Sequence, residues 1–135
     1  RIAHGLIDRL TAEGVPEEDI YVDPLVQPIG TDHTQARAVL DTIDVLRRER
    51  PGVHTICGLS NISYGLPGRR RLNRTFLVMA MARGLDSAIL DVLDAELMAL
   101  VKTVQALNGD DPYCMKYIKA YRAGELQVGR RKREE

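Results

Sequence analysis

Residues 58–69 read Gly-Leu-Ser-Asn-Ile-Ser-Tyr-Gly-Leu-Pro-Gly-Arg and mark the place where a buried strand gives way to a loop. The apolar run that precedes them, from His54 to Cys57, predicts a β-strand, and the apolar pattern that follows predicts a helix over about 70–83. The residues that follow the strand directly are small or polar: Gly58, Ser60 and Asn61. Ligands bind at the carboxyl edge of the sheet in folds that alternate strands and helices, so this edge is the candidate site.

The same alternation of short apolar strands and helices extends through the chain. Helices are expected over about 1–13, 33–50, 70–83, 94–107 and 112–122, and strands over 20–22, 54–59 and 87–91. The strands are apolar on both faces and about 33 residues apart, which fits consecutive βα units whose parallel strands are covered by helices. The sequence therefore predicts an α/β fold and leaves two architectures open: a small open sheet, or the carboxyl-terminal part of a (β/α)8 TIM barrel. We expect residues 1–124 to form this unit and residues 125–135 to be a polar tail.

Two further expectations concern side chains in the outer helices. One helical face of the first helix is apolar and is expected to pack inward: Ile2, Leu6, Ile7 and Leu10. One side of the last helix is expected to carry a tyrosine stripe: Tyr113, Tyr117 and Tyr121. Asp111 before Pro112 predicts the capped start of that helix.

Composition and charge exclude several classes of protein. The 135 residues are 44% hydrophobic and 28% charged, and their formal net charge is zero, so no global field favours nucleic acid as a partner. No apolar run reaches the length of a membrane span, and we expect no membrane association. The basic run Arg130–Arg133 is interpreted as part of a solvated tail. No secretory signal opens the sequence, so the cytoplasm is the expected compartment.

Cysteines and histidines predict no metal site. Cys57 and Cys114 lack metal-ligand spacing, and His4, His33 and His54 fall on different elements. Cys57 lies inside an apolar strand and is expected to behave as a small hydrophobe.

The stretch GLSNIS and the following GLPGRRRLNRTFLVMAMARGLDSAILDV resemble a known family. They are similar to the pterin-binding methyltransferases that use methyltetrahydrofolate and a corrinoid protein, such as the methyltetrahydrofolate:corrinoid/iron–sulfur protein methyltransferases. The likeness extends upstream to DIYVDPLVQPIGTDH and downstream through residues 113–121, so it covers nearly all of the chain. It implies a (β/α)8 barrel of the pterin-binding type, to which this chain contributes the sixth, seventh and eighth strands.

The resemblance also implies roles for six residues. Asp23 matches the aspartate that accepts hydrogen bonds from the amino-pyrimidine edge of the pterin. Asn61 matches the catalytic asparagine, whose amide approaches N5, the atom that gives up the methyl group. The other four match residues of the substrate-binding pocket: Gly58, Ser60, the loop residue Arg69, and Ile89 beside the ring.

The family likeness implies partners, and alternatives stay open beside it. Methyltetrahydrofolate would be the methyl donor, the corrinoid would be carried by a partner protein, and the full-length protein would be a homodimer. The alternatives are the folate module of cobalamin-dependent methionine synthase, a dihydropteroate synthase, and a non-enzymatic truncated fragment or binding module. Dihydropteroate synthase is disfavoured because it would need a lysine in place of Asn61. Without the resemblance, Asp23 before Pro24 reads as a turn residue and Asn61 as a loop or capping residue.

Overall fold

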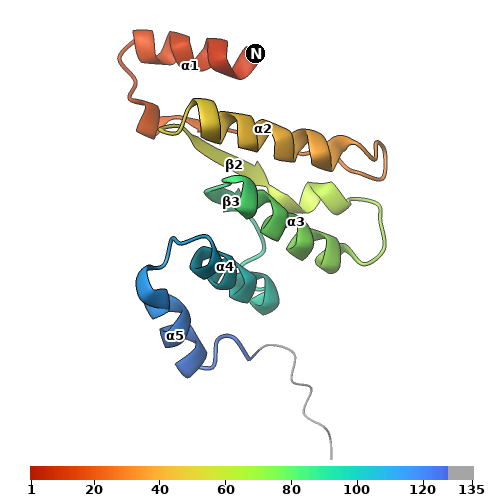
Figure 1. Cartoon of the computed structure of the whole chain (residues 1–135). Helices are drawn as coiled ribbons and strands as arrows, with labels where there is room; N and C mark the ends of the chain where they lie inside the picture. The colour runs from red at the N-terminus through yellow and green to blue at the C-terminus, as the bar shows by residue number, and fades with distance from the viewer. Residues whose placement is uncertain (128–135) are drawn as a thin grey trace, which may run out of the picture. The chain divides into compact units, whose positions relative to one another are not determined.

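The computed structural model describes residues 1–127 and divides the chain into two compact units (Figure 1). The first unit, Arg1–Leu90, holds all three strands, and the second begins at Asp91. We describe each unit by itself. The predicted boundary at residue 124 stays a prediction, and the basic run at 130–133 lies outside the described residues.

Helices and strands alternate as the sequence predicts, with boundaries shifted by a few residues. The first unit contains α1 (Ile2–Ala12), the 3₁₀ helix η1 (Glu17–Asp19), β1 (Tyr21–Val22), α2 (Gln35–Glu49), β2 (His54–Gly58), the 3₁₀ helix η2 (Leu59–Ser63), α3 (Arg69–Arg83) and β3 (Ser87–Ile89). The second contains α4 (Ala95–Leu107), the 3₁₀ helix η3 (Pro112–Cys114) and α5 (Met115–Arg122). None of the helices within residues 1–127 has the length and apolar character that crossing a membrane requires.

The three strands form one parallel sheet in the order β1-β2-β3. Tyr21 is the register partner of His54 in β2, and Gly58 at the end of β2 is the partner of Ile89 in β3. The predicted α/β class is therefore confirmed. Three consecutive parallel strands joined by helices are also compatible with part of a barrel.

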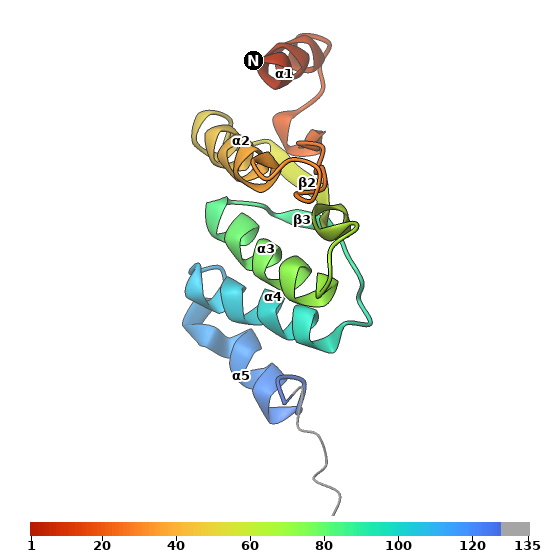
Figure 2. The same cartoon turned by 90° about the vertical axis from the view of Figure 1, so that its right-hand side faces the viewer.

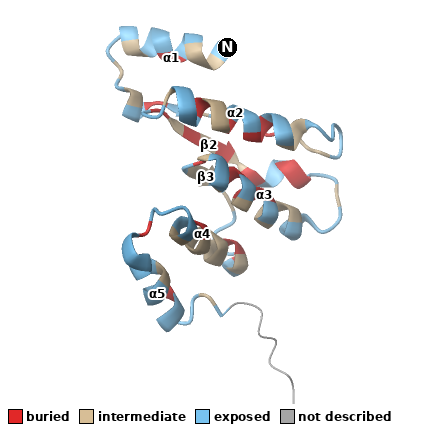
Figure 3. Ribbon diagram, in the orientation of Figure 1, coloured by how far each residue is buried: buried red, intermediate tan, exposed pale blue. Residues whose placement is uncertain are grey.

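Helices α2 and α3 lie on one side of the strands (Figure 2). The side chains of β2 alternate accordingly, with Thr55 and Cys57 buried and His54 and Ile56 half-buried. Buried residues gather in the strands, in η2 and on the inner sides of these two helices (Figure 3).

The opposite face of the sheet carries exposed side chains. Tyr21 stacks on His54 there, with ring centroids 4.5 Å apart, and both Tyr21 and Ile89 are exposed. Helices α2 and α3 therefore both pack against the same face of the strands.

Helix α1 meets the core along a narrow line. Ile7 is buried in a cluster with Ile20, Leu46 and Val53. Ile2, Leu6 and Leu10 are exposed, so the predicted inward face is wrong for three of its four residues. A helix that packs at the margin of a core buries only the residues that face its neighbour. Arg50, which follows α2, also forms ion pairs with Asp8 in α1 and Glu17 in η1. These carboxylates raise the pKa of Arg50.

In the second unit, two aspartates cap helices. Asp94 accepts a hydrogen bond from the backbone N–H of Leu97 at 3.2 Å, and Asp111 accepts from the N–H groups of Lys116 and Tyr117 at 3.0 and 2.9 Å. Asp111 thus caps the first turn of α5, although it is not the N-cap residue of that helix and makes no side-chain cap bond to η3, which starts at Pro112.

The start of the last helix differs from the prediction. Tyr113 and Cys114 take left-handed φ values of 54° and 56°, and α5 begins only at Met115. Tyr113 therefore lies outside α5, and the predicted stripe with Tyr117 and Tyr121 is wrong. Helical periodicity holds only where the backbone stays helical.

Candidate functional site

The carboxyl ends of the three strands meet at one edge of the sheet. Asp23 follows β1, Gly58 ends β2 and Ile89 ends β3. Ser60 and Asn61 lie in η2, directly after β2, and Arg69 begins α3. We call the group Asp23, Gly58, Asn61 and Ile89 the carboxyl-edge site. Parallel pairing brings these residues from three distant parts of the sequence to one edge.

Asp23 fixes a turn and keeps one oxygen available. Its Oδ1 accepts a hydrogen bond from the backbone N–H of Leu25 at 2.8 Å. Leu25 has a φ of 58°, a conformation that a branched side chain rarely adopts, and this bond helps to hold it. Asp23 is exposed, and its Oδ2 accepts no hydrogen bond from residues 1–127. The turn role and a ligand role therefore use different oxygens.

Asn61 ties together the segments that follow β1 and β2. Its Nδ2 donates to the backbone oxygen of Val26 at 2.7 Å. The backbone N–H of Ile29 donates to the oxygen of Ile62 at 3.1 Å, which makes a second bond between the same two segments. The Oδ1 of Asn61 forms no hydrogen bond within residues 1–127 and remains an acceptor.

The edge is open beside the ends of β2 and β3. A Cβ atom placed on Gly58 would meet no atom within 4 Å, and Ile89 is 70% exposed. An apolar side chain and an open backbone position thus lie next to each other in register.

The guanidinium group of Arg69 is bound to its own loop. Its Nε donates to the Oγ of Ser63 at 3.0 Å and its Nη2 donates to the backbone oxygen of Ser60 at 2.9 Å. Its central carbon also lies 5.9 Å from the centre of the Tyr64 ring. These contacts place the group against η2, and contact with a substrate stays a prediction.

The sequence reasoning missed two polar residues next to this site. Ser63 is completely buried, and its Oγ lies 2.7 Å from the Oδ1 of Asn73 in α3. The available signal was Asn73 itself, a polar residue three positions before the apolar run that starts at Phe76 in α3. Its partner cannot be read from the sequence, because the partner is fixed by how α3 packs on η2.

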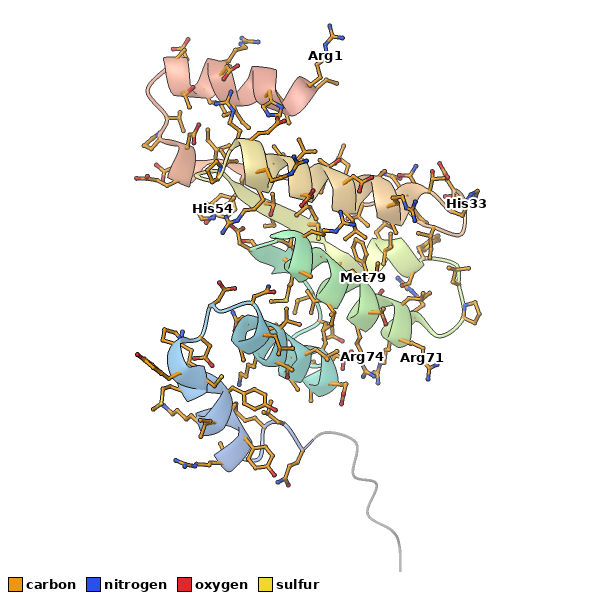
Figure 4. All side chains as sticks on the ribbon, viewed as in Figure 1. Arg1, His33, His54, Arg71, Arg74 and Met79 are labelled. Carbon is orange, nitrogen blue, oxygen red and sulfur yellow. The ribbon has the colours of Figure 1, made fainter. Side chains whose placement is uncertain are left out.

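Other reactive side chains of the described chain do not form a site. Burial, and then the negative charge of Asp23, raise the pKa of the Cys57 thiol to about 11, so the thiol is neutral near pH 7. His54 is hydrogen-bonded to Asp86 at 2.8 Å. Figure 4 shows His33 far from His54, beside the opposite end of α2. Residues 1–127 contain no group of three metal-binding side chains.

Comparison with known proteins places this edge inside a family match. Residues 3–91 match the family described as pterin binding enzyme, and all six predicted site residues fall within that range. Over 121 residues the chain is 32% identical to the methylcorrinoid:tetrahydrofolate methyltransferase of Eubacterium limosum. The aligned region covers 90% of this chain and 45% of that protein. Over 95 residues it is 40% identical to the methionine synthase of Mycobacterium tuberculosis, and this aligned region covers 65% of this chain and 8% of that protein. The chain therefore spans less than half the length of these curated relatives.

Proposed function

Because the chain belongs to the family of pterin-binding enzymes, we propose that it binds methyltetrahydrofolate and takes part in moving a methyl group between N5 and the cobalt of a corrinoid protein. The family resemblance seen in the sequence is confirmed. In this proposal the three βα units are the last three of a (β/α)8 barrel, and the carboxyl-edge site is part of its pterin pocket. The similarity to a methylcorrinoid:tetrahydrofolate methyltransferase supports this choice.

One observation carries the proposal. Asp23 and Asn61 come from different strand ends, yet they lie at one edge of the sheet, in segments that are hydrogen-bonded to each other. Each keeps an unpaired acceptor oxygen within residues 1–127. A carboxylate and a carboxamide held in this way suit the two polar edges of a reduced pterin.

Asp23 suits the amino-pyrimidine edge. The amino group and N3–H of a reduced pterin are two adjacent donors, and a carboxylate offers only acceptors. Pro24 and the bond to Leu25 restrict the backbone around Asp23, so the acceptor is held in place before the ligand arrives.

Asn61 suits N5. Breaking the bond between N5 and the methyl carbon leaves charge on N5 unless that nitrogen is protonated or strongly hydrogen-bonded. The Nδ2 of Asn61 is engaged with Val26, so its Oδ1 is the atom that would accept a hydrogen bond from N5–H. An interaction that strengthens as charge moves is one that accelerates the reaction. The corrinoid of the partner protein supplies the cobalt that accepts or gives the methyl group.

A second candidate is the folate module of a cobalamin-dependent methionine synthase, which the 40% identity to methionine synthase favours. The two candidates differ in whether the corrinoid belongs to a separate protein. The mass of the polypeptide made in the cell separates them: about twice the 15.1 kDa of this chain agrees with the first, and many times that mass agrees with the second. The cytoplasmic location and the homodimer expected from the sequence stay predictions.

The test is methyl transfer from methyltetrahydrofolate to a Co(I) corrinoid protein, followed by the cobalt absorption spectrum. The chain is assayed alone and together with the preceding half of a relative's barrel. We expect Asn61→Ala to lower the single-turnover rate by roughly 100- to 1,000-fold, the loss typical of one preorganised polar contact. Thr42→Ala removes an exposed hydroxyl on α2 and serves as the control with an unchanged rate. A wild-type rate in Asn61→Ala would refute the assigned role.

Asp23→Asn separates the ligand role from the turn role. Asparagine can keep the bond to the N–H of Leu25, but it replaces the second acceptor oxygen with a donor. We therefore expect normal folding and a dissociation constant for methyltetrahydrofolate raised roughly 10- to 100-fold. Calorimetric titration measures this change, and unchanged affinity would leave Asp23 with the turn role alone.

A further inference from the structure

We propose that Ser63, Asn73 and Arg69 form a polar network, centred on the buried hydroxyl of Ser63, that positions Asn61. The consequence for catalysis rests on the proposed function, whereas the effect on the placement of Asn61 does not. None of the three residues needs to touch the pterin for this role. Ser63 and Asn73 are positioning residues, and the structure gives Arg69 the same task through its bonds to η2.

Ser63 is the centre of the network. It is fully buried, and its hydroxyl lies 2.7 Å from the Oδ1 of Asn73 and 3.1 Å from the backbone oxygen of Ser60. It also accepts the N–H of Arg69 Nε at 3.0 Å. The hydroxyl has one proton, and the shorter distance favours its donation to Asn73, while its oxygen accepts from Arg69. These two bonds tie the turn around Ser63 to α3.

Asn73 connects this turn to a rigid helix. It lies in α3, where Phe76, Leu77 and Ala80 are buried against the rest of the first unit. The bond between Ser63 and Asn73 therefore anchors η2 to an element that cannot shift without disturbing the core. Apolar residues would fill the same space, but they would not select one orientation of the backbone.

The network reaches Asn61 through a single turn. Asn61 precedes Ser63 by two residues in η2, and its side chain must point correctly to donate to Val26 at 2.7 Å. The bond from Ile29 to the oxygen of Ile62 depends on the same turn. Arg69 adds a second brace, because its Nη2 holds the backbone oxygen of Ser60, the residue before Asn61. The position of Asn61 is thus defined from both sides.

Removing the Ser63 hydroxyl tests this inference. In Ser63→Ala, the half-buried Asn73 loses the donor to its Oδ1 and the Nε of Arg69 loses its acceptor, so η2 should loosen. We expect hydrogen exchange at the Ile29 amide to accelerate at least about tenfold, which corresponds to about 1.4 kcal/mol, and the NMR signals of the Asn61 side-chain amide to shift. Thr75→Ala removes a hydroxyl on the same helix outside the network and should leave both signals unchanged.

Arg69→Lys is the second variant, since it keeps the charge, lies on the surface and cannot make both bonds of the guanidinium fork. We expect faster hydrogen exchange at the Ile29 amide and shifted signals of the Asn61 side-chain amide, both smaller than in Ser63→Ala. Wild-type exchange at Ile29 and wild-type Asn61 signals in both folded variants would overturn the inference. In the methyl-transfer assay, Ser63→Ala should lower kcat by about tenfold and leave KM for methyltetrahydrofolate within about twofold. If the wild-type protein transfers no methyl group while Ile29 and Asn61 still respond, the proposed function fails and the positioning network stands.

Discussion

The ends of β2 and β3 lie side by side in the sheet, yet they are built in opposite ways. After β2 the chain enters η2, where Leu59, Ile62 and Ser63 are buried and the following helix α3 closes over them. At the end of β3, Ile89 is 70% exposed. The first end is stabilised by residues close to it in the sequence, and the second end leaves an apolar side chain accessible.

This difference indicates a division of tasks within the carboxyl-edge site. The side that carries Asn61 is held by hydrogen bonds and buried residues, which is what the precise placement of a polar group requires. The side that carries Ile89 is open, as an apolar contact beside a planar ring requires. Four experiments follow, in order of decreasing effect.

The largest expected effect comes from the core that supports η2. Leu77→Ala in α3 removes a side chain that is 2% exposed and should lower the free energy of unfolding by about 2–5 kcal/mol. The matched change Ile89→Ala at the end of β3 should cost less than about 0.5 kcal/mol. Urea unfolding measures both. Equal losses would show that the two strand ends do not differ.

The second experiment tests how tightly β2 is closed. The raised pKa of Cys57, about 11 compared with an ordinary value of 9.0, should slow its alkylation near pH 8 by about 100-fold in the folded protein relative to the same thiol in the urea-unfolded chain, with further protection from burial. Mass spectrometry of the labelled peptides measures the two rates. Equal rates would mean that β2 opens readily. The end of β2 would then not be more closed than the end of β3.

The same thiol predicts a pH dependence of stability. In the folded protein Cys57 keeps its proton above pH 9, where the thiol of the unfolded chain loses it. The unfolded state then binds fewer protons, so stability is complete below about pH 9 and falls as the pH rises towards 11. Cys57→Ser should flatten this part of the profile, which thermal unfolding at several pH values would show.

The smallest effect is expected at Asp32, in the segment between β1 and α2 to which Asn61 is hydrogen-bonded. The hydroxyl of Thr34, then its backbone N–H, then the amide of Gln35, lower the pKa of Asp32 to about 2. A lowered carboxyl pKa gives stability that is present above about pH 4 and is lost as the pH falls towards 2. Because Asp32 is exposed, Asp32→Asn should shift the unfolding midpoint far less than Leu77→Ala. NMR titration of the carboxyl group checks the pKa directly, and an ordinary value of 3.8 would contradict these hydrogen bonds.

Residue pattern alone determined the order of elements and the shared edge of Asp23, Gly58 and Ile89. Alternation of apolar runs is a local property, and parallel βα units place every strand end on the same side. The family resemblance then assigned possible roles to these residues. The sequence did not determine which side chains of α1 are buried or where α5 begins, because these depend on neighbours and on the left-handed backbone of Tyr113 and Cys114.

Only the tertiary structure decided how Asn61 is held. The bond from Asn61 to Val26 joins residues 35 positions apart, and its acceptor is a backbone oxygen that any residue would provide. The contact between Ser63 and Asn73 likewise depends on the packing of α3 against η2. Periodicity can place a residue on an element, but hydrogen-bond partners are fixed by the register between elements, which arises only when the core packs.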